Sequence, residues 1–272
     1  NTFFFLFIGL GLSANAQNLV PNSGFETYTQ LPTLPGQLQK ATGWLNSLGA
    51  TAGSPDYWNT LGTVNISSKI GAYTGNGYAG TYLEMYDSAT PGITDYKEYM
   101  TIQLSSSLQA GKTYRISFYT AHLHGSAPTT SFTFAPGVTF DDLPSAEQGY
   151  LGVVFSTAPP AAANTVGNTS PRWTSLRNDF GVGRVLIPST NTNVYGAASR
   201  NNWVKVDLLY TATGTEQYMT IGQLRPGATS MPDKVAAYYT YDEFSLTPVP
   251  TPGGVSAPDF WVKSDDAGTI AT

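Results

Sequence analysis

The sequence predicts an all-β protein, because three observations agree. Several segments alternate apolar and polar residues with the two-residue period of a half-buried strand. No segment keeps a helical period over several turns. Charged residues make up only 11% of the chain, against roughly a quarter in ordinary globular domains, and aromatic residues make up 13%. Strands joined by long irregular connections favour a jelly-roll β-sandwich of two antiparallel sheets with long loops over an up-and-down barrel.

The alternation places the expected strands along the chain. They cover residues 78–86, 99–104, 114–121, 150–156, 203–210, 217–223 and 238–247. In the third of these, Tyr114, Ile116 and Phe118 share one face, and the opposite face carries Arg115, Ser117 and Tyr119. Residues 109–112 have the composition of a turn, so the strands at 99–104 and 114–121 are predicted to form a hairpin.

The chain is predicted to consist of one large domain with short segments at both ends. Residues 1–16 have an apolar run followed by Ala14-Asn15-Ala16, which is typical of a secretory signal peptide cut after Ala16. The run is shorter than the roughly 20 residues that a membrane-spanning helix needs, so no transmembrane segment is expected. The domain is expected at 17–247, a Pro/Gly linker at 248–256, and the start of a truncated further module at 257–272.

Composition excludes several classes of function. The net charge of −5 without a Lys/Arg cluster argues against nucleic acid or an anionic membrane as partner. The chain has no cysteine, and it lacks the G-x-S-x-G and H-E-x-x-H motifs of common hydrolases. A carboxylate pair such as Glu84 and Glu98 is the remaining route to glycosidase chemistry, and chance proximity explains such a pair equally well. An enzyme is therefore not expected.

Both ends of the predicted domain carry a recognisable pattern. The opening Asn18-Leu19-Val20-Pro21-Asn22-Ser23-Gly24-Phe25-Glu26 and the closing Tyr239-Thr240-Tyr241-Asp242-Glu243-Phe244-Ser245-Leu246 resemble the first and last strands of jelly-roll carbohydrate-binding modules of the galactose-binding-like kind. The stretches between them are similar to exported Bacteroidetes surface proteins. The resemblance implies a structural Ca²⁺ with Glu26 and Asp242 as side-chain ligands. In the alternative, both carboxylates cap strand ends or bond to the backbone.

Candidate ligand-binding residues gather around the stretch GSPDYWN, which has the Gly, Pro, Asp and Asn of a surface loop. Sugars bind through flat aromatic faces and planar polar groups, and Asp56, Tyr57, Trp58 and Asn59 supply both. The strand at 78–86 is predicted to extend this platform with side chains on one face: Tyr82, Glu84 and Tyr86. In the alternative, Trp44 and Trp58 plug the ends of the sandwich.

His122 and His124 lie on one face of a predicted strand end. This spacing is compatible with a transition metal, which needs further ligands, and the chain offers only the distant pair Asp141 and Asp142. In the alternative, the histidines line a loop at the edge of the sandwich.

These expectations combine into one prediction of function. The chain is predicted to be a secreted, non-catalytic module, located outside the cell or on its outer surface, that binds a glycan or cell-surface polysaccharide. It is expected to be the N-terminal part of a larger exported protein. The alternative is a structural or adhesive β-sandwich without a small ligand. Exposure separates the two, because a sugar binder should expose Trp58 or Tyr82 and a structural module should bury them.

Overall fold

The computed structural model describes residues 17–48, 53–64, 70–89, 96–126, 137–166, 175–177, 180–225 and 231–250. The predicted signal peptide at 1–16, most of the predicted linker and the segment 257–272 lie outside the described residues. Within the described ranges, no helix is long and apolar enough to cross a membrane.

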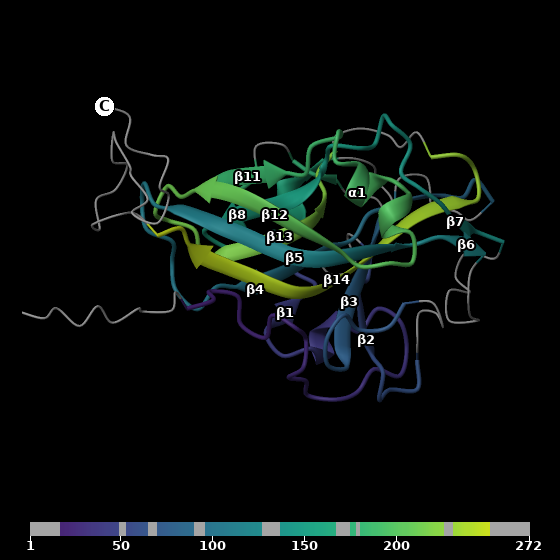
Figure 1. Cartoon of the computed structure of the whole chain (residues 1–272), viewed down its shortest axis with the longest axis horizontal. Helices are drawn as coiled ribbons and strands as arrows, with labels where there is room; N and C mark the ends of the chain where they lie inside the picture. Colours follow the sequence, from purple (N-terminus) through teal and green to yellow (C-terminus); the bar gives the residue numbers. More distant parts are fainter. Residues whose placement is uncertain are drawn as a thin grey trace, which may run out of the picture.

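Two sheets form a β-sandwich, as the sequence predicted (Figure 1). The larger sheet has the strand order β12-β5-β14-β3-β2 and also includes two short strands, β6 and β7. Its strands are β2 (Asp56–Asn59), β3 (Gly77–Tyr86), β5 (Thr113–Leu123), β6 (Gly125–Ser126), β7 (Thr139–Phe140), β12 (Val204–Thr211) and β14 (Val235–Pro248). All its pairs are antiparallel except β14 with β7.

The smaller sheet has the order β1-β4-β13-β8-β11 and is antiparallel throughout. Its strands are β1 (Trp44–Leu45), β4 (Tyr99–Gln103), β8 (Leu151–Ser156), β11 (Gly183–Leu186) and β13 (Tyr218–Gln223). A separate pair joins β9 (Thr165–Val166) to β10 (Ser175–Leu176). Helical segments are short: η1 (Leu38–Lys40), η4 (Ala162–Asn164), α1 (Thr192–Tyr195) and η5 (Ala197–Ser199).

All seven strands expected from the alternation are present. The predicted hairpin of 99–104 and 114–121 is wrong, because β4 and β5 belong to different sheets. The connection between them crosses the sandwich, and its two leucines, Leu104 and Leu108, are buried in the core. The chain also changes sheet between β3 and β4, between β11 and β12, and between each later pair, which is jelly-roll wiring.

The larger sheet is covered on both faces. On the inner face, Ile116, Phe118 and Tyr241 pack against residues of the smaller sheet such as Ile102 and Phe155. On the outer face lies a second apolar cluster, which we call the outer cluster: Trp58, Val64, Ile70, Tyr78, Tyr82, Met85, Tyr96, Ala121, Leu123, Val138, Phe140, Ala236 and Tyr238. Strands β2 and β3 are therefore covered on both sides, which explains why nearly all of their residues are buried.

The N-terminal segment lies beside the end of β14. Asn18 holds it there, because its Nδ2 donates to Phe244 O and its Oδ1 accepts from Leu246 N, both at 2.9 Å. The backbone N–H of Leu19 also donates to Leu246 O at 2.9 Å. We call this group the Asn18 clamp. It joins the opening and closing motifs of the sequence side by side.

Candidate functional site

The side chains predicted to form an exposed ligand platform lie inside the protein. The predicted loop is strand β2, and Asp56, Tyr57, Trp58 and Asn59 are at most 2% exposed. The prediction of a surface loop is wrong, because the turn-forming residues end before Asp56 and the strand that follows pairs with β3. Trp44 is also buried, stacked on Phe25 at 4.7 Å between ring centroids. The burial of both tryptophans agrees with the packing alternative.

The other three predicted platform residues do not share one face. The pairing of β3 with β14 shifts register between Ala237 and Tyr238, which is a β-bulge. Tyr82 consequently lies in the outer cluster, whereas Tyr86 is partly buried against the core between the sheets. Glu84 is fully buried and forms an ion pair of 2.5 Å with Lys97 Nζ. Strict alternation along the strand predicted that all three side chains share one face. The bulge shifts the alternation by one residue, so Tyr86 lies on the face opposite Tyr82.

A buried network connects Asp56 to the outer cluster. Trp58 Nε1 donates to the Tyr238 hydroxyl at 2.8 Å, and this hydroxyl donates to Asp56 Oδ2 at 2.5 Å. Gly80 permits the contact, because a Cβ there would lie 2.1 Å from the same hydroxyl oxygen. The polar atoms of Trp58 and Asp56 are thus committed to internal hydrogen bonds.

Glu98 forms a second buried carboxylate in the same region. Its oxygens accept from the Tyr96 hydroxyl at 2.8 Å and from the backbone N–H groups of Ser54 and Tyr82, both at 2.9 Å. Burial raises the pKa of Glu98 and of Asp56 well above their usual range. Glu84 and Glu98, the pair considered for glycosidase chemistry, are at most 1% exposed, whereas that chemistry needs two carboxyl groups that face an open cleft.

A group of aromatic rings that reaches solvent lies instead further along the outer face of the larger sheet, with Tyr73 exposed and Tyr119 and Trp203 partly buried. Tyr73 stacks on Tyr119 with ring centroids 3.7 Å apart and an interplanar angle of 16°. Trp203 meets Tyr73 edge-on at 6.2 Å, and its Nε1 donates to Gly71 O at 3.1 Å. Tyr73 is 41% exposed. We call these three residues the outer aromatic patch.

Polar groups surround the outer aromatic patch because of the strand register. Tyr119 on β5 pairs with Lys205 on β12 and with Asp242 on β14. Lys205 Nζ lies 3.2 Å from Asp207 Oδ2, and the two side chains are 48% and 44% exposed. A flat aromatic ring therefore lies beside an exposed cation and an exposed carboxylate.

Asp242 and Glu26 hold the loop that carries Tyr73. Asp242 Oδ2 accepts from the backbone N–H groups of Tyr73 and Thr74 at 2.8 and 3.1 Å. Glu26 Oε1 accepts from those of Asn76 and Gly77 at 2.8 and 2.7 Å. Burial raises the pKa of Asp242 to about 7.

These contacts match the alternative in which both carboxylates bond to the backbone. The N–H groups donate to the same carboxylate oxygens that a cation would contact. Calcium at Glu26 and Asp242 stays a prediction.

Part of the signal for the patch is present in the sequence. The alternation in 114–121 predicted Tyr119 on the face opposite Ile116 and Phe118, and in the structure that face is the outer one. Tyr73 lies in a connection outside any predicted strand, and Trp203 is the first residue of the predicted strand 203–210 and directly precedes β12. Their meeting depends on the fold, and no local pattern indicates it.

The chain was compared with known proteins. No family model and no curated protein matches it. Solved structures similar to it include a putative sugar-binding protein from Bacteroides thetaiotaomicron, with 12% identity, a TM-score of 0.35, and coverage of 86% of this chain and 100% of that one. Another is the K1 cleaved adhesin domain of Lys-gingipain from Porphyromonas gingivalis, with 13% identity, a TM-score of 0.37, and coverage of 84% and 96%.

A third similar structure is a CBM4 protein, with 15% identity, a TM-score of 0.29, and coverage of 85% and 99%. The similar structures are thus sugar-binding, adhesin and carbohydrate-binding proteins. Identities and TM-scores this low do not transfer a ligand or a site to this chain.

Proposed function

We propose that this chain is a non-catalytic module that binds carbohydrate on the outer aromatic patch. The observation that carries the proposal is the exposed Tyr73 ring, stacked on Tyr119 beside the exposed pair of Lys205 and Asp207. The apolar C–H face of a sugar ring packs on such an aromatic surface. A carboxylate and an ammonium group accept from and donate to neighbouring hydroxyls. The patch offers both kinds of contact on one face.

We infer that the module works outside the cell. The support is the N-terminal sequence, in which an apolar run precedes Ala14-Asn15-Ala16 as in a secretory signal peptide. The low fraction of charged residues and the absence of cysteine in the sequence are compatible with an exported bacterial protein. A cell-surface or extracellular glycan is then the ligand that such a module meets.

A structural or adhesive module without a small ligand is the second candidate. The burial of Trp58 and Tyr82 favours it, because exposure of these rings was the feature expected of a sugar binder. The two candidates now differ in what the outer aromatic patch does.

Affinity electrophoresis of the chain in gels containing soluble polysaccharides tests the proposal, with Tyr73→Ala as the decisive variant. Loss of one aromatic stacking contact of about 1.5 kcal/mol weakens binding roughly tenfold. Leu209→Ala is the matched control, because Leu209 is 59% exposed on β12 of the same sheet but lacks an aromatic ring.

We expect at least one polysaccharide to retard the wild type and the Leu209→Ala variant, and to retard Tyr73→Ala less. Equal retardation of all three proteins would place the binding site elsewhere. Retardation by none of the polysaccharides would favour the structural module.

A further inference from the structure

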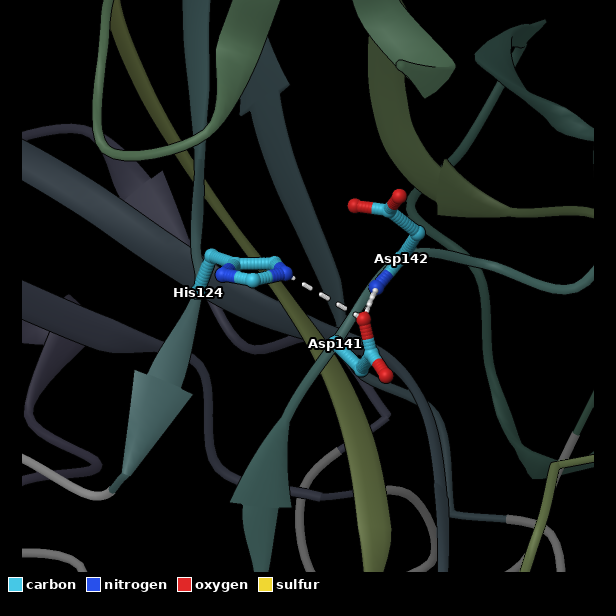
Figure 2. A group of neighbouring side chains, drawn as sticks. All are labelled: His124, Asp141 and Asp142. Atoms are coloured by element: carbon cyan, nitrogen blue, oxygen red, sulfur yellow. Dashed lines mark hydrogen bonds and ion pairs between the residues drawn. The ribbon is translucent and has the colours of Figure 1, made fainter. Parts of the chain in front are cut away.

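A group of histidine and aspartate side chains lies at the end of the sandwich formed by β5, β6 and β7. His122 is the second-last residue of β5, His124 follows the strand, and Asp141 and Asp142 follow β7. The ligand atoms of His124, Asp141 and Asp142 all lie within 4.8 Å of one another. Figure 2 shows the His124 ring directed at the Asp141 carboxylate, with 3.3 Å between Nε2 and Oδ1.

The backbone around these side chains is fixed by local hydrogen bonds. Asn201 binds the backbone of His124 at both ends, with its Oδ1 accepting from the N–H and its Nδ2 donating to the carbonyl oxygen, each at 3.1 Å. The N–H of Asp142 donates to Asp141 Oδ1 at 2.8 Å (Figure 2). These bonds hold the backbone of His124, Asp141 and Asp142 in place, as a metal site requires.

The buried ring of His122 gives the second, independent observation. The Ser199 hydroxyl hydrogen-bonds to Val194 O at 2.7 Å and to His122 Nδ1 at 3.0 Å, which fixes the orientation of the ring. The other ring nitrogen, Nε2, is fully buried and has no aligned hydrogen bond, although it lies 2.8 Å from Asp142 Oδ1. It is therefore a buried ring nitrogen that a metal ion beside Asp142 can use as a ligand.

We propose that a divalent transition-metal ion of the zinc class binds at His124, Asp141 and Asp142, with His122 Nε2 on the buried side of the site beside Asp142. Imidazole nitrogen together with carboxylate oxygen is a ligand set for zinc and its neighbours, whereas calcium prefers oxygen alone. The side chains of His124 and Asp141 are 33% and 59% exposed, so the ion can enter from solvent. The Ser199 hydroxyl orients the His122 ring, as hydrogen-bond partners of histidine rings do in known metal sites.

Arg200 is the other charged group that faces this site. Its Nε donates to Asp142 Oδ1 at 3.0 Å, and its Nη2 pairs with Oδ2. The guanidinium holds the Asp142 carboxylate in place, and it also competes with an ion for the same oxygens. Because the Arg200 side chain is 40% exposed, it can turn toward water when an ion binds.

Isothermal titration of the chelator-treated chain with zinc chloride tests the proposal. We expect saturable binding of one equivalent, and no competition from excess calcium. The double variant His124→Ala/Asp141→Ala removes two exposed ligands and keeps the core intact. It should weaken zinc binding by more than the roughly 10- to 100-fold that follows when a side chain hydrogen-bonded to a metal ligand is removed.

Asp207→Asn is the control, because Asp207 is an exposed carboxylate on β12 outside the cluster. Its zinc affinity should equal that of the wild type. Imidazole NMR gives a readout of the site that does not depend on the variants. Zinc should shift the ring resonances of His122 and His124, which are the only two histidines in the sequence. Absence of saturable binding would overturn the proposal. So would unchanged affinity in the double variant, or a His122 ring that keeps protons on both nitrogens in excess zinc.

Discussion

Tyr57 and Trp58 are neighbours in the chain but pack on opposite faces of the larger sheet. Tyr57 lies in the core between the sheets, and Trp58 lies in the outer cluster. Successive side chains of a strand point to opposite faces, so two adjacent large aromatic residues are both buried only where both faces of the strand are covered. The burial of both rings therefore reports that β2 is covered on both faces, although it is the edge strand of the larger sheet.

Replacement of Trp58 by alanine tests this assignment. The variant loses a fully buried indole and its bond to Tyr238, and we expect a loss of about 3–5 kcal/mol in the free energy of unfolding. Chemical denaturation measures it, with Leu61→Ala as control because Leu61 is 62% exposed. Polysaccharides should still retard the fraction of the variant that remains folded. A Trp58→Ala protein of normal stability that no longer binds would show instead that the indole contacts ligand.

At the scale of elements, the loop of residues 70–77 depends on carboxylates that lie far from it in sequence. Asp242 follows the part of β14 that pairs with β3 and bonds to two backbone N–H groups of this loop. Glu243 beside it has φ of 52°, a left-handed conformation that accompanies the irregular register of β14 with β5. The bulge thus places Asp242 under the loop and the loop places Tyr73 on Tyr119.

Asp242→Ala leaves the N–H groups of Tyr73 and Thr74 without their acceptor. We expect a loss of about 1–3 kcal/mol in stability and weaker retardation by any polysaccharide that the wild type binds. Asp207→Ala removes an exposed carboxylate from the same face and should change stability by less than about 0.5 kcal/mol.

Thermal melting of the wild type and of Asp242→Ala tests calcium. We expect a calcium chelator to leave the wild-type Tm unchanged, because backbone N–H groups already satisfy both carboxylates. A fall in Tm on chelation, absent in Asp242→Ala, would establish the ion that the family resemblance implies.

The sequence predicts regular elements better than it predicts their partners. Alternation located seven strands because one face of each strand packs on the core. This requirement acts on neighbouring residues, so it is visible in the sequence. It missed the β4–β5 separation, since a short turn-like connection looks the same whether the chain reverses within a sheet or crosses between sheets. It also placed Tyr82 and Tyr86 together, since nothing local marks the bulge opposite Ala237.

The candidate sites show the same difference between local patterns, which could be predicted, and contacts between distant segments, which could not. His122 and His124 are separated by one residue, so their common face was predictable. Their approach to Asp141 and Asp142 depends on the pairing of β6 with β7, which the sequence did not predict.

At the scale of the whole molecule, buried carboxyl groups make stability depend on pH. Burial raises the pKa of Asp56 from 3.8 to about 7 and that of Glu98 from 4.5 to about 8. The folded state therefore holds these protons more tightly than the unfolded state does. Their contribution to stability is fully present below about pH 4 and is lost as the pH rises through 7 and 8.

We expect the Tm to fall between about pH 6.5 and pH 9. Burial lowers the pKa of His122 to about 4, so protonation of this ring changes the stability only below about pH 6.5. Glu98→Gln keeps the shape of the side chain and removes the ionisable group, so its melting temperature should fall less over the same range. Scanning calorimetry at several pH values measures both proteins. A wild-type Tm that is constant or rises over this range would contradict the assignment.

The Asn18 clamp has a consequence for mechanical load. The segment that begins at Asn18 and the end of β14 run side by side, so a pull applied at residues 18 and 248 acts at one edge of the sandwich. Such a pull opens the contacts to Leu246 and Phe244 one after another, as a zipper opens, and does not shear several strands at once. A tether through these two points would yield at low force while the sheets stay folded, and it would close again when the tension ends.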